Sequence, residues 1–184
     1  MKSAKLFFPC AWLLAVVCSL PASVAAHVVL TEPSAPAGSY YKATLRVSHG
    51  CDGQATTALV VQLPDGLQGG KPQPKAGWHV STRKARLAQP YDNHGKTVTD
   101  DVVEIRWEAT SADTRLPDDQ FDEFSFLTRL PEQAGPLWFK VSQQCEQTHV
   151  DWSQVPAQGT STRGLATPAA LLDVQASEMS HHHH

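Results

Sequence analysis

His27 has the most distinctive chemistry in this sequence, because it follows a segment typical of a secretory signal peptide. Two lysines open the chain, residues 6–20 are almost all apolar, and residues 22–26 are mostly small. This is the order of an export signal, and the apolar run is too short for a comfortable membrane span. Residues 1–26 are therefore predicted to be a signal peptide, and the mature protein is predicted to be periplasmic or secreted.

The position of the cut decides which residue becomes the free N-terminus. Val24 and Ala26, at the minus-three and minus-one positions, place the cut before His27, which is the favoured position. Ser23 and Ala25 would support a cut one residue earlier. When His27 is first, its α-amino group and its Nδ1 can close a six-membered chelate ring on one metal ion. A residue ahead of His27 would abolish that chelate.

The two nitrogens of this chelate suit copper. The α-amine titrates at about 8 and imidazole at about 6.5, so both can be deprotonated at neutral pH when a metal binds. Nitrogen ligands favour Cu(II), which also leads the affinity order of the divalent metals. The sequence therefore predicts a Cu(II) site at His27. The alternative is a histidine that follows the cleavage site by chance.

Cys51 and Cys145 are the two cysteines that remain after the predicted cleavage. In an exported chain, such a pair is typical of a disulfide. The loop that it would close is long, which on the loop-entropy model is worth about 4 kcal/mol. A thiolate metal site is the alternative, but the oxidising compartment and the wide separation disfavour it.

The rest of the chain is predicted to form the scaffold of an all-β protein. Alternating apolar and polar residues predict strands at 41–47, 58–63, 78–82, 102–107, 121–130 and 137–141. Turns rich in Pro, Gly, Asn and Asp separate them, and no long amphipathic stretch interrupts them. Short strands at this spacing indicate an antiparallel sandwich. The core candidates are aromatic: Trp78, Trp107, Phe121, Phe124, Phe126 and Trp138.

The sandwich is expected to occupy residues 27–156, followed by a partly flexible C-terminal extension, 157–184, in which 165–174 could add an edge strand. The chain ends in four histidines, which are either native and metal-binding or a purification tag. The net charge of −3 and the absence of a Lys/Arg run disfavour nucleic acid and anionic membranes as partners. No membrane span is expected after residue 26, and no hydrolase triad or phosphate loop stands out.

Several segments carry a resemblance to a known family. They read HVVLTEPSAPAGSY (27–40), LRVSHGCDG (45–53), VQLPDG (61–66), KPQPKAGW (71–78), FDEFSF (121–126), QCE (144–146) and DW (151–152). Together they resemble the YcnI-like family of exported bacterial copper-binding proteins, from His27 to about residue 156. The resemblance implies an immunoglobulin-like or cupredoxin-like β-sandwich with its metal site at the mature N-terminus.

The resemblance also implies which residues hold the metal. In that family the amine and imidazole of the first histidine bind Cu(II), helped by a glutamate, with a tryptophan beside the metal. The first residue corresponds to His27 and the tryptophan to Trp152. The place of the glutamate falls around His49, whose imidazole would make the site a two-histidine brace. Glu32 is the alternative carboxylate ligand. The other internal histidines are expected to be structural or solvated: His79, His94 and His149.

The function expected from these features is that of an exported Cu(II)-binding protein in copper trafficking or homeostasis. As a metallochaperone or buffer, it would exchange copper with other exported copper-handling proteins. An enzymatic activity is not expected. The alternatives are a copper-dependent oxidative enzyme built on the same histidine brace, and a metal-free structural or adhesion module.

Overall fold

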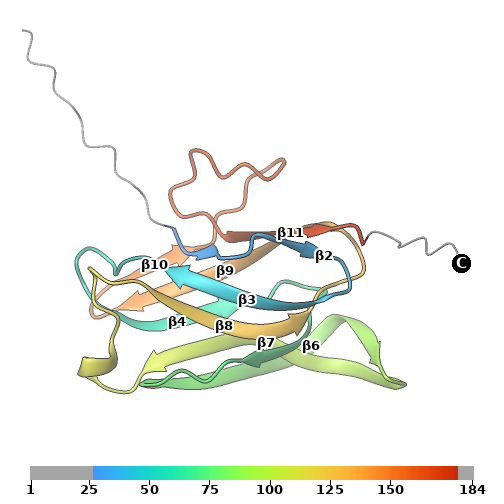
Figure 1. Ribbon diagram of the computed structural model, residues 1–184, viewed down its shortest axis with the longest axis horizontal. Coiled ribbons are helices and arrows are strands. Elements are labelled where there is room, and N and C mark those ends of the chain that lie inside the picture. The colour runs from blue at the N-terminus through green and yellow to red at the C-terminus, as the bar shows by residue number, and fades with distance from the viewer. Residues whose placement is uncertain (1–26, 178–184) are drawn as a thin grey trace, which may run out of the picture.

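The computed structural model describes residues 27–177, which form a sandwich of two β-sheets (Figure 1). The predicted signal peptide and the terminal histidines lie outside the described residues. Within residues 27–177 the only helical element is a 3-10 turn, η1 (Ala112–Thr114), and no helix is long and apolar enough to cross a membrane. The predicted all-β sandwich is confirmed.

The first sheet has four strands and carries the N-terminal end of the described chain. Their order is β1 (Val29–Leu30), β3 (Tyr40–Val47), β8 (Asp122–Arg129) and β5 (Gln68–Pro72), all antiparallel. Alternate residues of β3 are buried against the second sheet: Tyr41, Ala43, Leu45 and Val47. This alternation is what predicted the strand from the sequence.

The second sheet is larger and includes the C-terminal strand. Its order is β2 (Ser34–Pro36), β11 (Ala170–Gln175), β9 (Gly135–Cys145), β4 (Thr56–Gln62), β7 (Lys96–Ala109) and β6 (Trp78–Asn93), and β10 (His149–Trp152) also pairs with β9. β11 and β10 lie end to end along the same edge of β9. The pairs are antiparallel except β2 with β11.

Aromatic side chains fill the space between the sheets. Trp107, Phe124, Phe126 and Phe139 are fully buried, and Trp107 meets Phe124 edge-on with ring centroids 5.8 Å apart. The predicted disulfide between Cys51 and Cys145 is confirmed. It joins the loop after β3 in the first sheet to the end of β9 in the second, so it fastens the two layers at one end of the sandwich.

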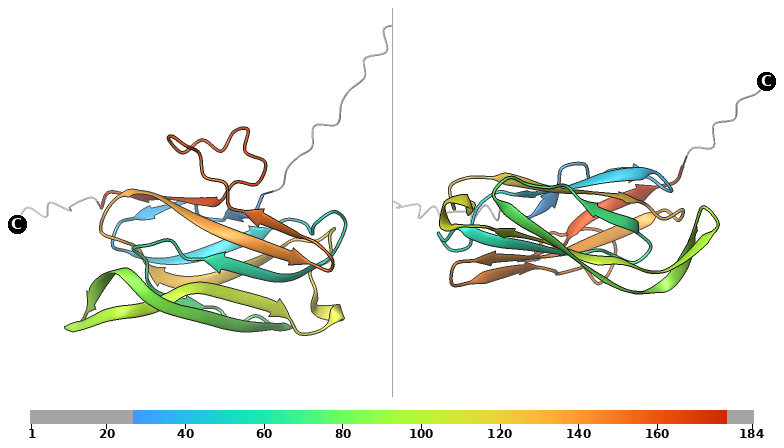
Figure 2. Two further views of the ribbon diagram at one scale, coloured as in Figure 1. Left: turned by 180° about the vertical axis from the view of Figure 1, so that it is seen from behind. Right: turned by 90° about the horizontal axis from the view of Figure 1, so that it is seen from below.

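The hairpin of β6 and β7 is longer than the sequence predicted. The strands continue to Asn93 and from Lys96, around a turn in which His94 and Gly95 have φ of 52° and 80°. Positive φ at both central residues matches the twist of a hairpin. The far end of the hairpin lies at the periphery of the molecule (Figure 2), where both faces are largely exposed. An apolar alternation is therefore missing there, which is why the prediction stopped short.

Two further expectations differ from the structure. Phe121 was expected in the core but is 67% exposed, because it lies just before β8 begins. The strand expected at 165–174 is present as β11, but it lies between β2 and β9, not at an edge, and it buries Leu172 and Val174. The segment between β10 and β11 forms a large loop at the top of Figure 1. Trp78 and Trp107 are buried as expected, whereas Trp138 is half-buried.

Candidate metal site

The pairing of β1 with β3 places His27 at one end of the first sheet. Val29 pairs with Arg46 and Leu30 with Leu45. Val28 and Leu30 point into the core and are nearly fully buried, so they anchor this short strand. Continuing the antiparallel register by two residues brings His27 opposite residue 48 and beside His49. The structure thus brings the two predicted histidines to the same end of the sandwich.

The imidazole of His27 packs against a tryptophan from the other sheet. It is half-buried, and its ring meets that of Trp152 at 71° with centroids 5.8 Å apart. Its Nε2 is buried and has no hydrogen-bond partner among the described residues. An unpaired buried polar group costs about 1–3 kcal/mol. The ring is therefore not held through Nε2 by the hydrogen bonds of the fold, as a purely structural histidine normally would be.

His49 lies in the loop between β3 and the disulfide. Its Nδ1 is in hydrogen-bond contact with the carbonyl oxygen of Gly50. A carbonyl can only accept, so Nδ1 carries the proton in this contact and the lone pair is on Nε2. Metal-binding histidines are commonly oriented in this way, with one nitrogen donating to a backbone carbonyl. The local geometry of His49 is thus compatible with metal binding through Nε2.

Trp152 forms a buried wall beside His27. It lies at the end of β10, where it pairs with Val141 of β9, and is 5% exposed. Its indole Nε1–H donates to Oε1 of Gln143 at 3.0 Å. The family resemblance predicted Trp152 beside the metal, which stays a prediction; the structure shows its ring in contact with that of His27.

Glu32 lies away from His27. The two residues flank β1 at opposite ends, and the carbonyl oxygen of Glu32 accepts a 2.6 Å bond from the hydroxyl of Tyr41. Burial, helped by the negative charge of Glu32, raises the pKa of Tyr41 above its usual value. The structure therefore places Glu32 beside Tyr41 and does not bring it together with His27 and His49.

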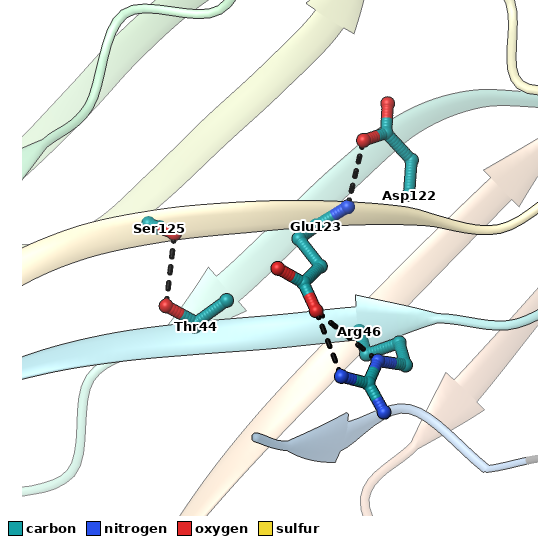
Figure 3. A network of polar contacts seen from close by, with 5 residues as sticks. All are labelled: Thr44, Arg46, Asp122, Glu123 and Ser125. Atoms are coloured by element: carbon teal, nitrogen blue, oxygen red, sulfur yellow. Dashed lines mark hydrogen bonds and ion pairs between the residues drawn. The ribbon is translucent and has the colours of Figure 1, made fainter. Parts of the chain in front are cut away.

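The carboxylates at the start of β8 are engaged in ion pairs. Asp122 contacts Nζ of Lys75 at 2.7 Å, and Glu123 receives two hydrogen bonds from Arg46 (Figure 3). Among residues 27–177 there is no group of three or more His, Cys, Asp or Glu side chains arranged to hold a metal.

Sequence reasoning missed Gln143, whose side chain is buried behind this site. Its Nε2 donates to the main-chain oxygen of His49 at 2.7 Å and to Oγ1 of Thr56 at 2.8 Å, and its Oε1 accepts from Trp152. A signal was present in the sequence. Gln143 shares the inward face of β9 with Phe139 and Val141, so a polar amide interrupts an otherwise apolar row.

The remaining internal histidines lie elsewhere and are exposed. His79 pairs across the sheet with Glu108, whose pKa is lowered mainly by Arg106. His94 is in the hairpin turn, and His149 lies 3.7 Å from the carboxylate of Asp151. A surface groove runs between β5 and β6, with Trp78 and His79 in its lining, and it is not part of the candidate site.

Known proteins resemble this chain in sequence and in fold. A sequence model of the family described as "Domain of unknown function (DUF1775)" matches residues 27–174. The copper-binding protein CutI of Bacillus subtilis (strain 168) is 25% identical over 158 residues, which cover 85% of this chain and 66% of CutI. The chain thus spans just under two thirds of that relative's length.

A solved structure resembles the whole sandwich. It is the crystal structure of an uncharacterized protein from Nocardia farcinica, reported to have an immunoglobulin-like fold. It superposes with a TM-score of 0.63 at 26% identity, covering 82% of this chain and 99% of that one. The predicted immunoglobulin-like fold is therefore confirmed. Because the family match covers most of the chain, the protein belongs to the DUF1775 family, and the predicted membership of the YcnI-like family is confirmed.

Proposed function

We propose that the mature protein begins at His27 and binds one Cu(II) ion at this terminus. The observation that carries the proposal is the placement of the His27 imidazole: it packs against Trp152, at the end of the first sheet where the loop after β3 carries His49. The copper-binding relative CutI supports copper as the metal. Copper would be the cargo that the protein binds and exchanges.

Three nitrogens would hold the ion. The α-amine and Nδ1 of His27 provide two from a single residue, and Nε2 of His49 provides the third. The contact between Nδ1 of His49 and the carbonyl of Gly50 supports this assignment, since it puts the lone pair on Nε2. Two histidines and an amine also account for a site without a cluster of three metal-binding side chains in residues 27–177.

The role that fits this arrangement is carriage or buffering of Cu(II) outside the cytoplasm. The terminus lies at one end of the sandwich, at the edge strand β1, so an incoming ligand can approach it. The buried indole of Trp152 contacts the imidazole in an edge-type arrangement and would border the bound metal. Three protein donors leave coordination positions for a donor from another exported copper-handling protein, which transfer by ligand exchange requires.

The roles of the His27 and His49 side chains as copper ligands can be tested by titrating Cu(II) into protein that starts at His27 and lacks the terminal histidines. The wild type is expected to bind one tight equivalent with nitrogen hyperfine structure in its EPR spectrum. His27→Ala should abolish this binding, and His49→Ala should weaken it by more than about tenfold, since a ligand matters more than an outer-shell partner. His149→Ala, which removes an exposed histidine, is the matched control and should bind as the wild type does.

Equal affinity of the wild type and His27→Ala would refute the proposed site. Equal affinity of the wild type and His49→Ala, with loss in His27→Ala, would refute the two-histidine brace alone. In that case a carboxylate or water would be the third donor.

A further inference from the structure

We propose that Gln143 is a positioning residue of the copper site: its one buried amide fixes the indole of Trp152 and the main chain of His49 relative to each other, and so sets the geometry in which His27 and His49 hold Cu(II). The inference rests on the proposed function, because it concerns the same site. Gln143 is placed behind the metal-binding residues and acts through them.

The amide of Gln143 makes every hydrogen bond that its donors allow. The residue is 1% exposed. One Nε2–H donates to the oxygen of His49 at 2.7 Å, and the other donates to Oγ1 of Thr56 at 2.8 Å. Oε1 accepts the indole N–H of Trp152 at 3.0 Å. A buried amide with both hydrogens and its oxygen engaged is held in one orientation.

The chemistry of the partners rules out the flipped amide. An indole nitrogen can only donate, so it must face Oε1, and a main-chain carbonyl can only accept, so it must face Nε2. Exchanging the two ends would put donor against donor at Trp152 and acceptor against acceptor at His49. The position of the Trp152 indole is therefore tied to that of the His49 main chain through the single amide of Gln143.

The contact with His49 links the two sheets, which strand pairing does not do. Trp152 is on β10 and Thr56 is on β4, which flank β9 on opposite sides, whereas His49 follows β3 of the other sheet. The disulfide already fastens the loop after β3 to the end of β9, since Cys51 lies two residues after His49 and Cys145 two residues after Gln143. The disulfide limits the separation of the loop and the strand. The amide determines how the indole and the His49 carbonyl face each other.

A purely structural role for Gln143 predicts something different. A buried amide that only satisfies polar groups should affect stability and leave the bound copper unchanged. A positioning role predicts that the copper signal changes even in a folded variant, because the indole beside His27 and the backbone of His49 lose their common support. Outer partners of metal ligands typically change metal affinity by about 10- to 100-fold.

The experiment compares Gln143→Met with two controls in protein that starts at His27. Methionine keeps the length of the side chain and removes all three hydrogen bonds. Gln144→Met alters the neighbouring glutamine, whose Oε1 accepts from Arg106 instead. Thr56→Val removes one bond of the same buried amide and keeps the bonds to Trp152 and His49, so it controls for lost stability.

Gln143→Met is expected to weaken Cu(II) binding by about 10- to 100-fold and to change the copper hyperfine splitting in the EPR spectrum. In the metal-free protein, the indole N–H of Trp152 should exchange faster with solvent in NMR spectra. Gln144→Met and Thr56→Val should keep the copper affinity and spectrum of the wild type. If Gln143→Met does not fold, Gln143→Glu carries the test, since it keeps an oxygen for Trp152 and loses the NH₂ group that donates to His49.

Tight binding by the wild type with unchanged affinity and spectrum in the Gln143 variant would overturn the inference and leave the proposed function standing. An equal loss of affinity in Thr56→Val would also overturn it, because the effect would then follow stability alone. Unchanged exchange of the Trp152 indole N–H in metal-free Gln143→Met would overturn it independently of copper. Failure of the wild type to bind one tight equivalent would overturn the proposed function and, with it, this inference.

Discussion

Replacing Trp152 by Phe removes the indole N–H that donates to Gln143, and replacing Gln143 by Met removes the acceptor. Both residues are almost fully buried, at 5% and 1% exposure, and the bond between them is 3.0 Å long. Each single change strands one atom of this pair away from water, which costs about 1–3 kcal/mol, and Gln143→Met also unpairs groups of His49 and Thr56. The double variant strands neither atom of this pair, so its loss should be smaller than the sum of the single losses by both costs together, about 2–6 kcal/mol.

The free energy of unfolding of the metal-free wild type, both single variants and the double variant would be measured by urea denaturation. The unpaired groups of His49 and Thr56 are common to Gln143→Met and the double variant, so they cancel in the cycle. The coupling energy then reports the bond between Trp152 and Gln143. Losses that add to within about 0.5 kcal/mol, as is usual for distant sites, would refute the buried bond as a stabilising contact.

Three further outcomes follow from the structure. Replacing Cys51 and Cys145 by Ala should lower the free energy of unfolding by about 4 kcal/mol, measured by denaturation without reductant, and a loss under about 1 kcal/mol would contradict this. Burial and a hydrogen bond to a carboxylate raise the pKa of Tyr91 to about 12. The folded protein holds the Tyr91 proton more tightly than the unfolded chain does. The contribution of Tyr91 to the free energy of unfolding should therefore disappear as the pH rises from about 10 to about 12. Tyr91→Phe should remove that phenolate from a spectroscopic titration, and an unchanged titration curve would contradict this. Arg46→Met breaks an exposed ion pair with Glu123 and should change stability by no more than about 1 kcal/mol, less in high salt; a larger, salt-insensitive loss by denaturation would contradict it.

Much of the sandwich could be predicted from the sequence because its central strands bury one face. The predicted strand at 41–47 is β3 less its first residue, since buried and exposed side chains alternate through most of it. The distal part of the β6–β7 hairpin has no such pattern, as both of its faces are largely exposed. β11 is short and lies beyond a long irregular loop, so the sequence indicated a possible edge strand at 165–174 but not its place inside the sheet.

The candidate site could be predicted only in part. His27 stands out because of its position after the predicted export signal, and the family resemblance pointed to Trp152 as a residue beside the metal. The distance between them in the sequence means that only tertiary structure shows the contact itself. Gln143 was overlooked because the sequence does not reveal which polar groups would be buried beside it. Its three bonds come from segments that are far apart in the chain.

The central claim is that a free amine on His27 completes a copper site, and it is tested most directly by blocking that amine. Two proteins would be compared, both lacking the terminal histidines: one that begins at His27 and one with a single Ala ahead of it. Cu(II) would be titrated into each and followed by EPR. One tight equivalent with nitrogen hyperfine structure in the first protein, lost in the extended one, is the expected result. Equal binding by both proteins would contradict the account.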